Sequence, residues 1–360
     1  MPLQQCRWGI LGTANIARKN WQAIHNSGNA TLSAVASRES SKAEKFILDL
    51  QQQCPYQVTP SACTYEELLA RKDVDAVYIP LPTGLRKDWV IRAAQAGKHV
   101  LCEKPCAVSN ADLQEMVQAC RDNRVQFMDG VMFMHSQRLP LLRESLSQLG
   151  TLRRMQFHFS FLPPDEFFQS NIRAQSQFEP QGCAGDLGWY CIRMALWIMN
   201  ETKPVAVAAR MLDQIDGVPM ELTAELTFEN GVTSGFYCSF RSDQQQTMTV
   251  SGSNGYLKID DFVLPFFGNE AGLSLEKSDF QISGCQFNMA HRSERKSVPE
   301  FSNNHVTSQE TRLFRTFSNL VLSGTPDPVW SAISQKTQRV LDACLQSAQK
   351  DGATVAIPRN

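Results

Sequence analysis

Short apolar runs alternate with amphipathic stretches along the first third of the chain. The apolar runs have the length and composition of buried strands, and they occupy residues 6–11, 31–36, 75–82, 99–102 and 125–133. Helical patterns lie between them: one through Trp21 and Ile24, a short one opened by the capping-box pair Thr64 and Glu67, one over 89–96, and one from Ser109 to about Cys120. Strands and helices alternating at this spacing predict a doubly wound parallel sheet.

The pattern changes beyond about Met134, where period-two alternation replaces the strand and helix units. Asn230-Gly231 and Asn254-Gly255 each lie between alternating runs, which is the strongest short signal for a hairpin. Further segments follow from the pattern: a strand over 153–161, helices over 187–199, 311–322 and 333–348, and a polar stretch over 275–305 that we expect to be a long loop or flap.

These patterns predict an α/β protein of two domains. Residues 1–133 form the domain with the doubly wound parallel sheet, and residues 134–360 form an α/β domain with a large, mostly antiparallel open sheet. The C-terminal helices over 311–322 and 333–348 could pack back on the first domain. One face of the open sheet needs a cover. The apolar residues of its predicted strands fit self-association and plain core packing equally well: Phe236, Tyr237, Phe240 and Val250.

Composition narrows the classes of function. The 360 residues are enough for two cores, and 35 basic against 36 acidic side chains give no reason to expect nucleic acid or an anionic membrane as a partner. No apolar run is long enough to span a membrane and no signal-peptide pattern opens the chain, so we expect a cytoplasmic protein. Eleven cysteines without a C-x-x-C pair indicate neither a disulfide framework nor a zinc site, and no metal is expected.

The first strand runs into Gly12-Thr13-Ala14-Asn15-Ile16-Ala17 before a helix. In a dinucleotide-binding turn the first glycine permits a sharp turn, the second lets the backbone approach the pyrophosphate, and the third position accepts alanine. Ala14 occupies the second position, which weakens the match. The same spacing is also common in turns that bind nothing.

The residues after the second strand bear on the choice of cofactor. A carboxylate there accepts hydrogen bonds from the ribose of NAD, whereas the 2′-phosphate of NADP needs donors and positive charge. Ser37 and Arg38 supply these, and Lys42 lies one helical turn on, so NADP is favoured over NAD. Glu39 argues the other way, and Arg38 could also be an ordinary solvated charge.

The strand that starts at His99 ends in Glu103-Lys104-Pro105. Parallel strands end at the edge of the sheet where open α/β folds bind ligands, so Lys104 is a candidate catalytic residue. A solvated charge pair at a strand end is the alternative. Pro105 makes the bond after Lys104 a candidate for a cis peptide.

Asp186 and Tyr190 are four residues apart, which places both on one face of a helix. Glycines 182, 185 and 188 would let this helix approach a ligand closely. Tyrosine, with an ordinary pKa of about 10, is a poor base near neutrality unless a cation such as Lys104 favours the phenolate. Alternatively, Tyr190 is a core residue and Asp186 a carboxylate favoured by the helix dipole.

Four motifs together resemble one family. Residues 12–17, 81–83, 103–105 and 182–190 occur in the order and approximate spacing of the glucose-fructose oxidoreductase / inositol dehydrogenase / rhizopine-catabolism protein family. The chain looks closest to the branch that holds dimeric dihydrodiol dehydrogenase and NADP-dependent D-xylose dehydrogenase. The resemblance implies a Rossmann domain followed by an α/β domain whose open sheet often forms a homodimer. The chain departs from the family pattern at Ala14, at Arg86 where histidine is frequent, and at Met134 where arginine is frequent.

The resemblance also assigns roles. Lys104 matches the catalytic lysine, Tyr190 the acid/base, and Asp186 its neighbour one turn earlier. Leu81, Pro82, Thr83 and Glu103 join the turn at Gly12 as cofactor-binding residues. The candidates for substrate contact are Arg173, His135 and Trp189.

The predicted activity is NADP-dependent hydride transfer to or from a small molecule, namely a sugar, a polyol or a trans-dihydrodiol. An NAD-dependent glycoside-cleaving enzyme of the same fold and a non-catalytic NADP-sensing regulator are the alternatives.

Overall fold

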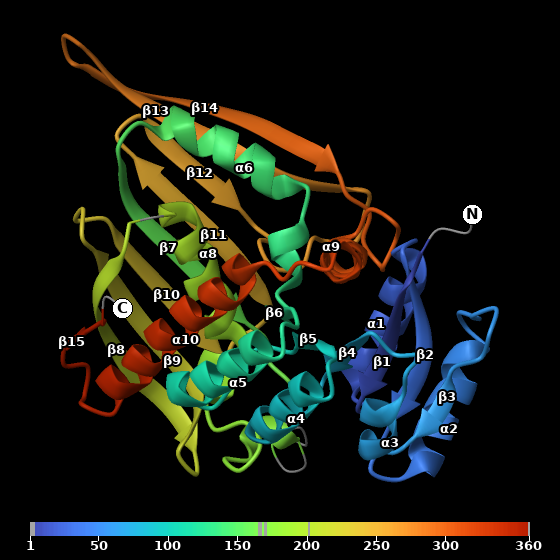
Figure 1. Cartoon of the computed structure of the whole chain (residues 1–360). Helices are drawn as coiled ribbons and strands as arrows, with labels where there is room; N and C mark the ends of the chain where they lie inside the picture. Colours follow the sequence, from blue (N-terminus) through green and yellow to red (C-terminus); the bar gives the residue numbers. More distant parts are fainter. Residues whose placement is uncertain (1–3, 165–167, 169–170, 201, 359–360) are drawn as a thin grey trace. The chain divides into compact units, whose positions relative to one another are not determined.

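The structure is a computed structural model that describes residues 4–164, 168, 171–200 and 202–358 (Figure 1). The chain divides into two compact units. The first unit contains Met1–His135, Asn171–Pro180 and Asn303–Arg339, and the second contains Ser136–Ser170, Gln181–Ser302 and Val340–Asn360. Each unit has its own sheet. Among the described residues, no helix combines the length and the apolar character that a membrane span requires.

The first unit is built on a six-stranded parallel sheet with the order β3-β2-β1-β4-β5-β6. Its strands are β1 (Cys6–Leu11), β2 (Ala30–Ala36), β3 (Ser61–Cys63), β4 (Ala76–Ile79), β5 (His99–Cys102) and β6 (Phe127–Asp129). Its helices are α1 (Asn15–Asn26), α2 (Ser40–Gln51), α3 (Tyr65–Ala70), α4 (Thr83–Gln95), α5 (Asn110–Asp122) and α9 (Gln309–Ser323). This order is that of a Rossmann sheet, with the topological switch between β1 and β4, and it confirms the predicted fold of this half.

Helix α9 completes the core of the first unit although it comes from the end of the chain. The ring of Trp8 on β1 lies 5.1 Å from that of Phe314 and 5.0 Å from that of Phe317, and all three are buried. The indole Nε1 of Trp8 also donates to Ser318 Oγ at 3.0 Å. Burying three aromatic side chains stabilises this unit by several kcal/mol, on the order of 2 kcal/mol each.

The second unit is built on a nine-stranded sheet with the order β14-β13-β12-β11-β7-β10-β9-β8-β15. Its strands are β7 (Leu152–Ser160), β8 (Pro204–Ile215), β9 (Val218–Phe228), β10 (Thr233–Ser239), β11 (Gln245–Gly252), β12 (Gly255–Ile259), β13 (Glu270–Ser283), β14 (Gln286–Pro299) and β15 (Val355–Ala356). Neighbours pair antiparallel except β7 with β10. The predicted mostly antiparallel sheet and both Asn-Gly hairpins are therefore confirmed.

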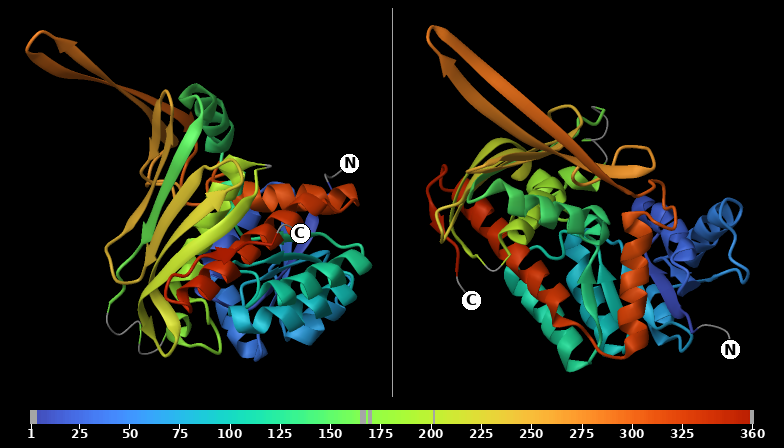
Figure 2. Two further views of the ribbon diagram at one scale, coloured as in Figure 1. Left: turned by 90° about the vertical axis from the view of Figure 1, so that its left-hand side faces the viewer. Right: turned by 90° about the horizontal axis from the view of Figure 1, so that it is seen from above.

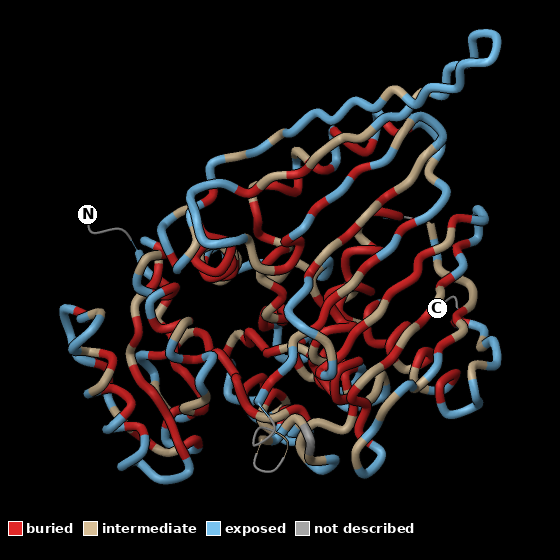
Figure 3. The backbone as a smooth tube through the Cα atoms, turned by 180° about the vertical axis from the view of Figure 1, so that it is seen from behind, coloured by how far each residue is buried: buried red, intermediate tan, exposed pale blue. Residues whose placement is uncertain are grey.

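Helix α6 (Arg138–Leu146), a π-helical turn (Ala184–Gly188) and α8 (Trp189–Met199) belong to this unit, and α10 (Pro328–Ala348) divides between the two units. The two faces of the sheet differ. Phe236, Phe240 and Val250 are buried, so core packing accounts for them. Tyr237 lies on the other face, which is lined mostly by polar side chains; Figure 3 shows the resulting alternation of buried and exposed positions along the strands. We refer to this second face as the open face.

Three expectations about elements were wrong, and one helix was missed. Residues 275–305 are not a loop: β13 and β14 pair continuously from Glu270 with Pro299 to Ser283 with Gln286, as a hairpin that extends beyond the neighbouring strands (Figure 2). Its outer part is largely polar, and its apolar side chains alternate only over two short runs, Phe280–Ile282 and Phe287–Met289, so the polar composition concealed the strands. Helix α4 begins at Thr83 instead of Trp89, β6 is only three residues long, and α6 was not predicted at all.

Candidate active site

Most of the residues expected to bind the cofactor lie at one edge of the parallel sheet. The carboxyl ends of β1, β2, β4 and β5 lead into the turn at Gly12, the Ser37-Arg38 pair, Leu81-Pro82-Thr83 and Glu103-Lys104. Strands β1 and β4 flank the switch point, and an open α/β sheet binds its ligand there. The fold thus gathers motifs that are about 90 residues apart in the sequence.

The turn after β1 packs closely against the loop after β4. Gly12 has a φ of +126°, and a Cβ added there would lie 3.0 Å from Leu81 Cδ2. Ala14, the departure from the glycine pattern, has a φ of −65°, which any residue adopts without strain. The first turn of α1 contains no acidic residue, and Ala14 provides no side-chain cap. The backbone N–H groups of this turn therefore suit a phosphate, through hydrogen bonds and the helix dipole.

The end of β2 leaves one cation facing solvent. Ser37 is buried, and its N–H donates to the Cys63 carbonyl at 3.1 Å. Arg38 is exposed. Burial raises the pKa of Tyr65, and the positive charge of Arg38 partly opposes that shift. Lys42 donates to Glu39 at 3.0 Å on the surface. Glu39, the carboxylate that argued against NADP, is therefore held in an ion pair with Lys42.

Glu179 caps helix α4, an arrangement that the sequence did not reveal. Its carboxylate accepts from the N–H of Thr83 at 3.0 Å and from Thr83 Oγ1 at 2.5 Å. The N–H of Gly84 donates to the Phe178 carbonyl at 2.9 Å. These bonds tie residues 171–180, which include the half-buried Arg173, to the Leu81-Pro82-Thr83 motif.

A chain of buried hydrogen bonds supports the Lys104 turn. Asn20 Nδ2 donates to the Tyr78 hydroxyl at 2.7 Å, and that hydroxyl donates to Glu103 Oε1 at 2.5 Å. The other carboxylate oxygen of Glu103 accepts from the Lys104 N–H at 3.1 Å. Burial, followed by the nearby Glu103 carboxylate, holds the pKa of Tyr78 well above its usual range, so this tyrosine remains a donor. Glu103 therefore acts as a support of the lysine turn.

Arg86 holds the same turn from the other side. Its buried guanidinium donates to the Leu81 carbonyl at 2.6 Å, to the Glu103 carbonyl at 3.1 Å and to the Pro105 carbonyl. One cation thus joins the loops after β4 and β5. A guanidinium has five N–H donors, which lets this one side chain serve three carbonyls at once. The Lys104–Pro105 bond is cis, the isomer considered from the sequence.

His135 has a structural environment in the first unit. Its ring stacks on that of Trp330, with centroids 4.9 Å apart and planes 16° from parallel, and its carbonyl accepts from Arg312 Nε at 2.9 Å. Stacking accounts for the burial of this ring. The substrate contact predicted for His135 stays a prediction.

Asp186, Trp189 and Tyr190 lie on one helical segment of the second unit. The segment starts earlier than predicted, with a π-helical turn over Ala184–Gly188 that leads into α8. A π turn closes with i→i+5 bonds, so side chains advance by a different angle than in the α-helix that the spacing assumed; such turns are frequent at functional sites. Asp186 in this turn is half-buried.

Tyr190 is 5% exposed, and its ring meets that of Phe159 edge-on at 5.6 Å. The predicted substrate residue Trp189 has no exposed surface, and the Arg193 guanidinium lies 5.8 Å from the centre of its ring. Trp189 thus has the surroundings of a core residue.

Two of the nearby glycines serve packing against the sheet. Gly182 has a φ of +46°, and a Cβ there would lie 2.0 Å from the Pro219 carbonyl oxygen. A Cβ on Gly188 would contact Cys238 Sγ and the Phe236 ring, each at 3.4 Å. Strand β9 occupies the space beside Gly182, so room for a ligand is not what this glycine provides; the close approach expected at Gly188 stays a prediction.

Comparison with known proteins identifies the relatives of this chain. The family model for the oxidoreductase family with an NAD-binding Rossmann fold matches residues 6–131, and the model for the GFO/IDH/MocA C-terminal domain matches residues 145–258. The chain is 28% identical to D-xylose 1-dehydrogenase (NADP(+)) 2 of Haloferax volcanii, over 96% of this chain and 98% of the relative. It is 29% identical to trans-1,2-dihydrobenzene-1,2-diol dehydrogenase of Mus musculus, over 80% and 84%.

A solved structure of KijD10, a 3-ketoreductase from Actinomadura kijaniata in complex with NADP and TDP-benzene, superposes with a TM-score of 0.82 at 26% identity, over 96% of this chain and 98% of that one. The two family models together cover well over half of the chain, and the motifs quoted from the sequence fall at the ends of the expected elements. The chain belongs to the GFO/IDH/MocA family of oxidoreductases.

Proposed function

We propose that this protein transfers a hydride between NADP and a carbinol or carbonyl carbon of a sugar, a polyol or a trans-dihydrodiol. The observation that carries the proposal is the Lys104 turn. It lies at the binding edge of a Rossmann sheet, and Arg86, Glu103 and Tyr78 support it from behind. The names of the xylose and dihydrodiol relatives favour the same class of reaction.

The donor set in the first unit fits NADP. The turn at Gly12 and the first turn of α1 would hold the pyrophosphate, and Leu81, Pro82 and Thr83 would line the approach of the nicotinamide half. The exposed Arg38 beside Ser37 would meet the ribose 2′-phosphate. When bound, the nicotinamide supplies or accepts the hydride.

The protein's own residues manage the proton. Tyr190 would give a proton to the substrate oxygen in reduction and take it in oxidation, and the Lys104 ammonium would stabilise the phenolate and donate to the same oxygen. Asp186 would orient the tyrosine or the substrate hydroxyls. This scheme needs the domain of residues 1–133 and the domain of residues 134–360 to contribute to one site, with Arg173 as a further substrate contact.

The relatives named above differ in the form of substrate that their names indicate. Two act on a free aldose or on a dihydrodiol by name, whereas the ketoreductase was solved with a thymidine diphosphate derivative. We favour the free small molecule, because the sequence motifs resemble the branch that holds the xylose and dihydrodiol dehydrogenases. A homodimer through the open face of the second unit and a cytoplasmic location complete the proposal.

A substrate panel tests it. The purified chain is incubated with aldoses, polyols, trans-dihydrodiols and a nucleotide-linked keto sugar, each with NADP(H) and with NAD(H), and the nicotinamide absorbance is followed. We expect turnover with at least one free sugar, polyol or dihydrodiol and a preference for NADP. Release of a leaving group without net cofactor reduction would indicate the glycoside-cleaving alternative. NADPH binding without turnover on any substrate would indicate the regulator.

A further inference from the structure

The outer part of the β13–β14 hairpin carries a group of exposed apolar side chains. From Lys277 onward these two strands pair only with each other, because β12 pairs with β13 only as far as Glu276. We call residues 277–292 the arm, and at about 3.3 Å per residue it reaches roughly 20 Å past the sheet (Figure 2). We call residues 280–289 the arm tip. It carries four large side chains, each 58–64% exposed: Phe280, Ile282, Phe287 and Met289.

The register places these four side chains on one side of the arm. Phe280 pairs with Met289 and Ile282 pairs with Phe287, and directly opposed residues of an antiparallel pair face the same way. The rings of Phe280 and Phe287 lie 5.8 Å apart across the strands. They therefore form a single patch, and its position at the end of a two-stranded ribbon leaves it far from the core of its own unit.

The same register shows that the patch continues the open face. Ser274 of β13 pairs with Lys258, which pairs with Thr249, which pairs with Gln156. Thr249 and Gln156 line the open face, so the even-numbered residues of β13, including Phe280 and Ile282, lie on that side of the sheet.

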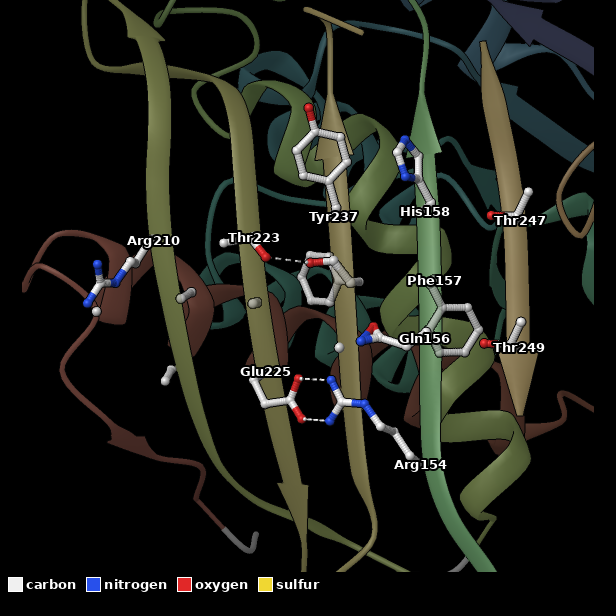
Figure 4. Close-up of a pocket in the computed structure, with 16 residues that line it drawn as sticks. Arg154, Gln156, Phe157, His158, Arg210, Thr223, Glu225, Tyr237, Thr247 and Thr249 are labelled. Carbon is white, nitrogen blue, oxygen red and sulfur yellow. Dashed lines mark hydrogen bonds and ion pairs between the residues drawn. The ribbon is translucent and has the colours of Figure 1, made fainter. Parts of the chain in front are cut away.

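The open face contains a hollow of about 590 Å³ (Figure 4). Small residues such as Ala208, Gly235 and Thr249 line it, together with larger polar side chains that include Gln156, His158 and Tyr237. Arg154 at its rim is already paired with Glu225 by two bonds, of 2.5 and 3.1 Å. Covering the hollow would leave this ion pair intact, whereas Arg210, which also lines the hollow, would need an acceptor on the partner copy. The arm thus projects bulky side chains and the open face is hollowed, so the two surfaces of the chain are complementary in shape.

We propose that the arm tip docks on the open face of a second copy of this chain. The inference rests on the homodimer included in the proposed function and names the segment that secures it. At roughly 190 Å² per large side chain, the patch exposes on the order of 450 Å². In a two-fold dimer the contact occurs twice and buries both partners' surfaces, roughly 1,800 Å² in total. That area is what a stable protein–protein interface buries, about 1,600 Å².

Sedimentation velocity of the full chain over a range of concentrations tests the arm. The double variant Phe280→Ser/Phe287→Ser should weaken dimerisation about 100-fold or more, as the loss of central aromatic contacts does. Thr249→Arg, which fills the hollow, should weaken it as well. The control is Leu48→Ser on α2, where an equally exposed apolar side chain, 62% exposed, is lost outside the arm. The control should dimerise as the wild type does.

The wild-type chain provides a second readout that needs no variant. Cys285 lies in the turn at the arm tip and is the one exposed side chain among the eleven cysteines, all of which the structure describes. Its alkylation by N-ethylmaleimide should slow as the protein concentration rises through the dimer transition. A chain that is monomeric at every concentration would overturn both the dimer and the arm contact. Another result would overturn the arm contact alone. In that case Thr249→Arg disrupts the dimer, the double arm variant leaves it intact, and Cys285 is equally reactive at every protein concentration.

Discussion

Replacing Arg86 with methionine tests how far one buried cation holds the lysine turn together. The side chain is 6% exposed. Methionine keeps an apolar stem and removes the donors to the carbonyls of Leu81, Glu103 and Pro105. A buried carbonyl left without a donor costs about 1–3 kcal/mol. The three carbonyls share one cation and water can enter the space, so we expect a total loss of about 3 kcal/mol rather than the full sum.

Urea denaturation followed by circular dichroism measures that loss, provided that the slope against urea is unchanged. Arg86→Lys is the matched control, because its ammonium keeps the charge but reaches fewer carbonyls, and it should lose an intermediate amount. Turnover gives an independent readout. Arg86→Met should lower kcat by at least about tenfold, since the turn carries Lys104, and should leave NADPH affinity nearly unchanged. A stability loss below about 1 kcal/mol together with an unchanged kcat would refute this role for Arg86.

Four further outcomes follow from single side chains. Arg38→Ala should weaken NADPH binding far more than NADH binding in fluorescence titrations; equal losses would argue against a 2′-phosphate contact. Tyr78→Phe removes a donor to a buried carboxylate and should cost about 1–3 kcal/mol in urea denaturation, whereas no loss would contradict the hydrogen-bond chain. Burial lowers the pKa of His99, so unfolding takes up a proton below the unfolded value of about 6.5, and stability is full above that pH and falls below it. The non-titrating His99→Asn should lack this part of the pH dependence, and superimposable profiles would exclude His99 as its source. Gly182→Ala should lower stability by more than about 2 kcal/mol, because its Cβ would overlap the Pro219 carbonyl; a neutral variant would mean that the backbone moves freely there.

The sequence was sufficient for the parallel sheet and for the lysine turn. Buried parallel strands appear as short apolar runs, and the helices between them begin or end at residues such as Thr64 and Gly97 whose chemistry is local. The edge at which Lys104 lies then follows from topology. Even the cofactor preference depends on the two residues after β2, which are next to a strand that the pattern predicts well.

The supports of the turn could not be predicted because they leave no pattern in the sequence. Arg86 binds backbone carbonyls, which every residue has, and Glu179 caps a helix that begins 96 positions earlier in the chain. The arm was missed for a different reason: its apolar side chains alternate only over the short runs 280–282 and 287–289, within a segment that is otherwise polar. A glycine in the sequence is compatible with close packing and with close approach of a ligand. At Gly182 and Gly188 only the neighbouring strands, which the sequence does not place, show that packing is present.

The cooperation of Lys104 and Tyr190 is the central claim, and single-turnover kinetics tests it most directly. Lys104→Met and Tyr190→Phe are mixed with NADPH and the best carbonyl substrate from the panel, and oxidation of the nicotinamide is followed by stopped flow. We expect each variant to bind NADPH as the wild type does and to lose at least about a hundredfold in the rate of the chemical step, with the double variant little slower than either single one because the two residues act as a unit. A wild-type rate in either single variant would contradict the account.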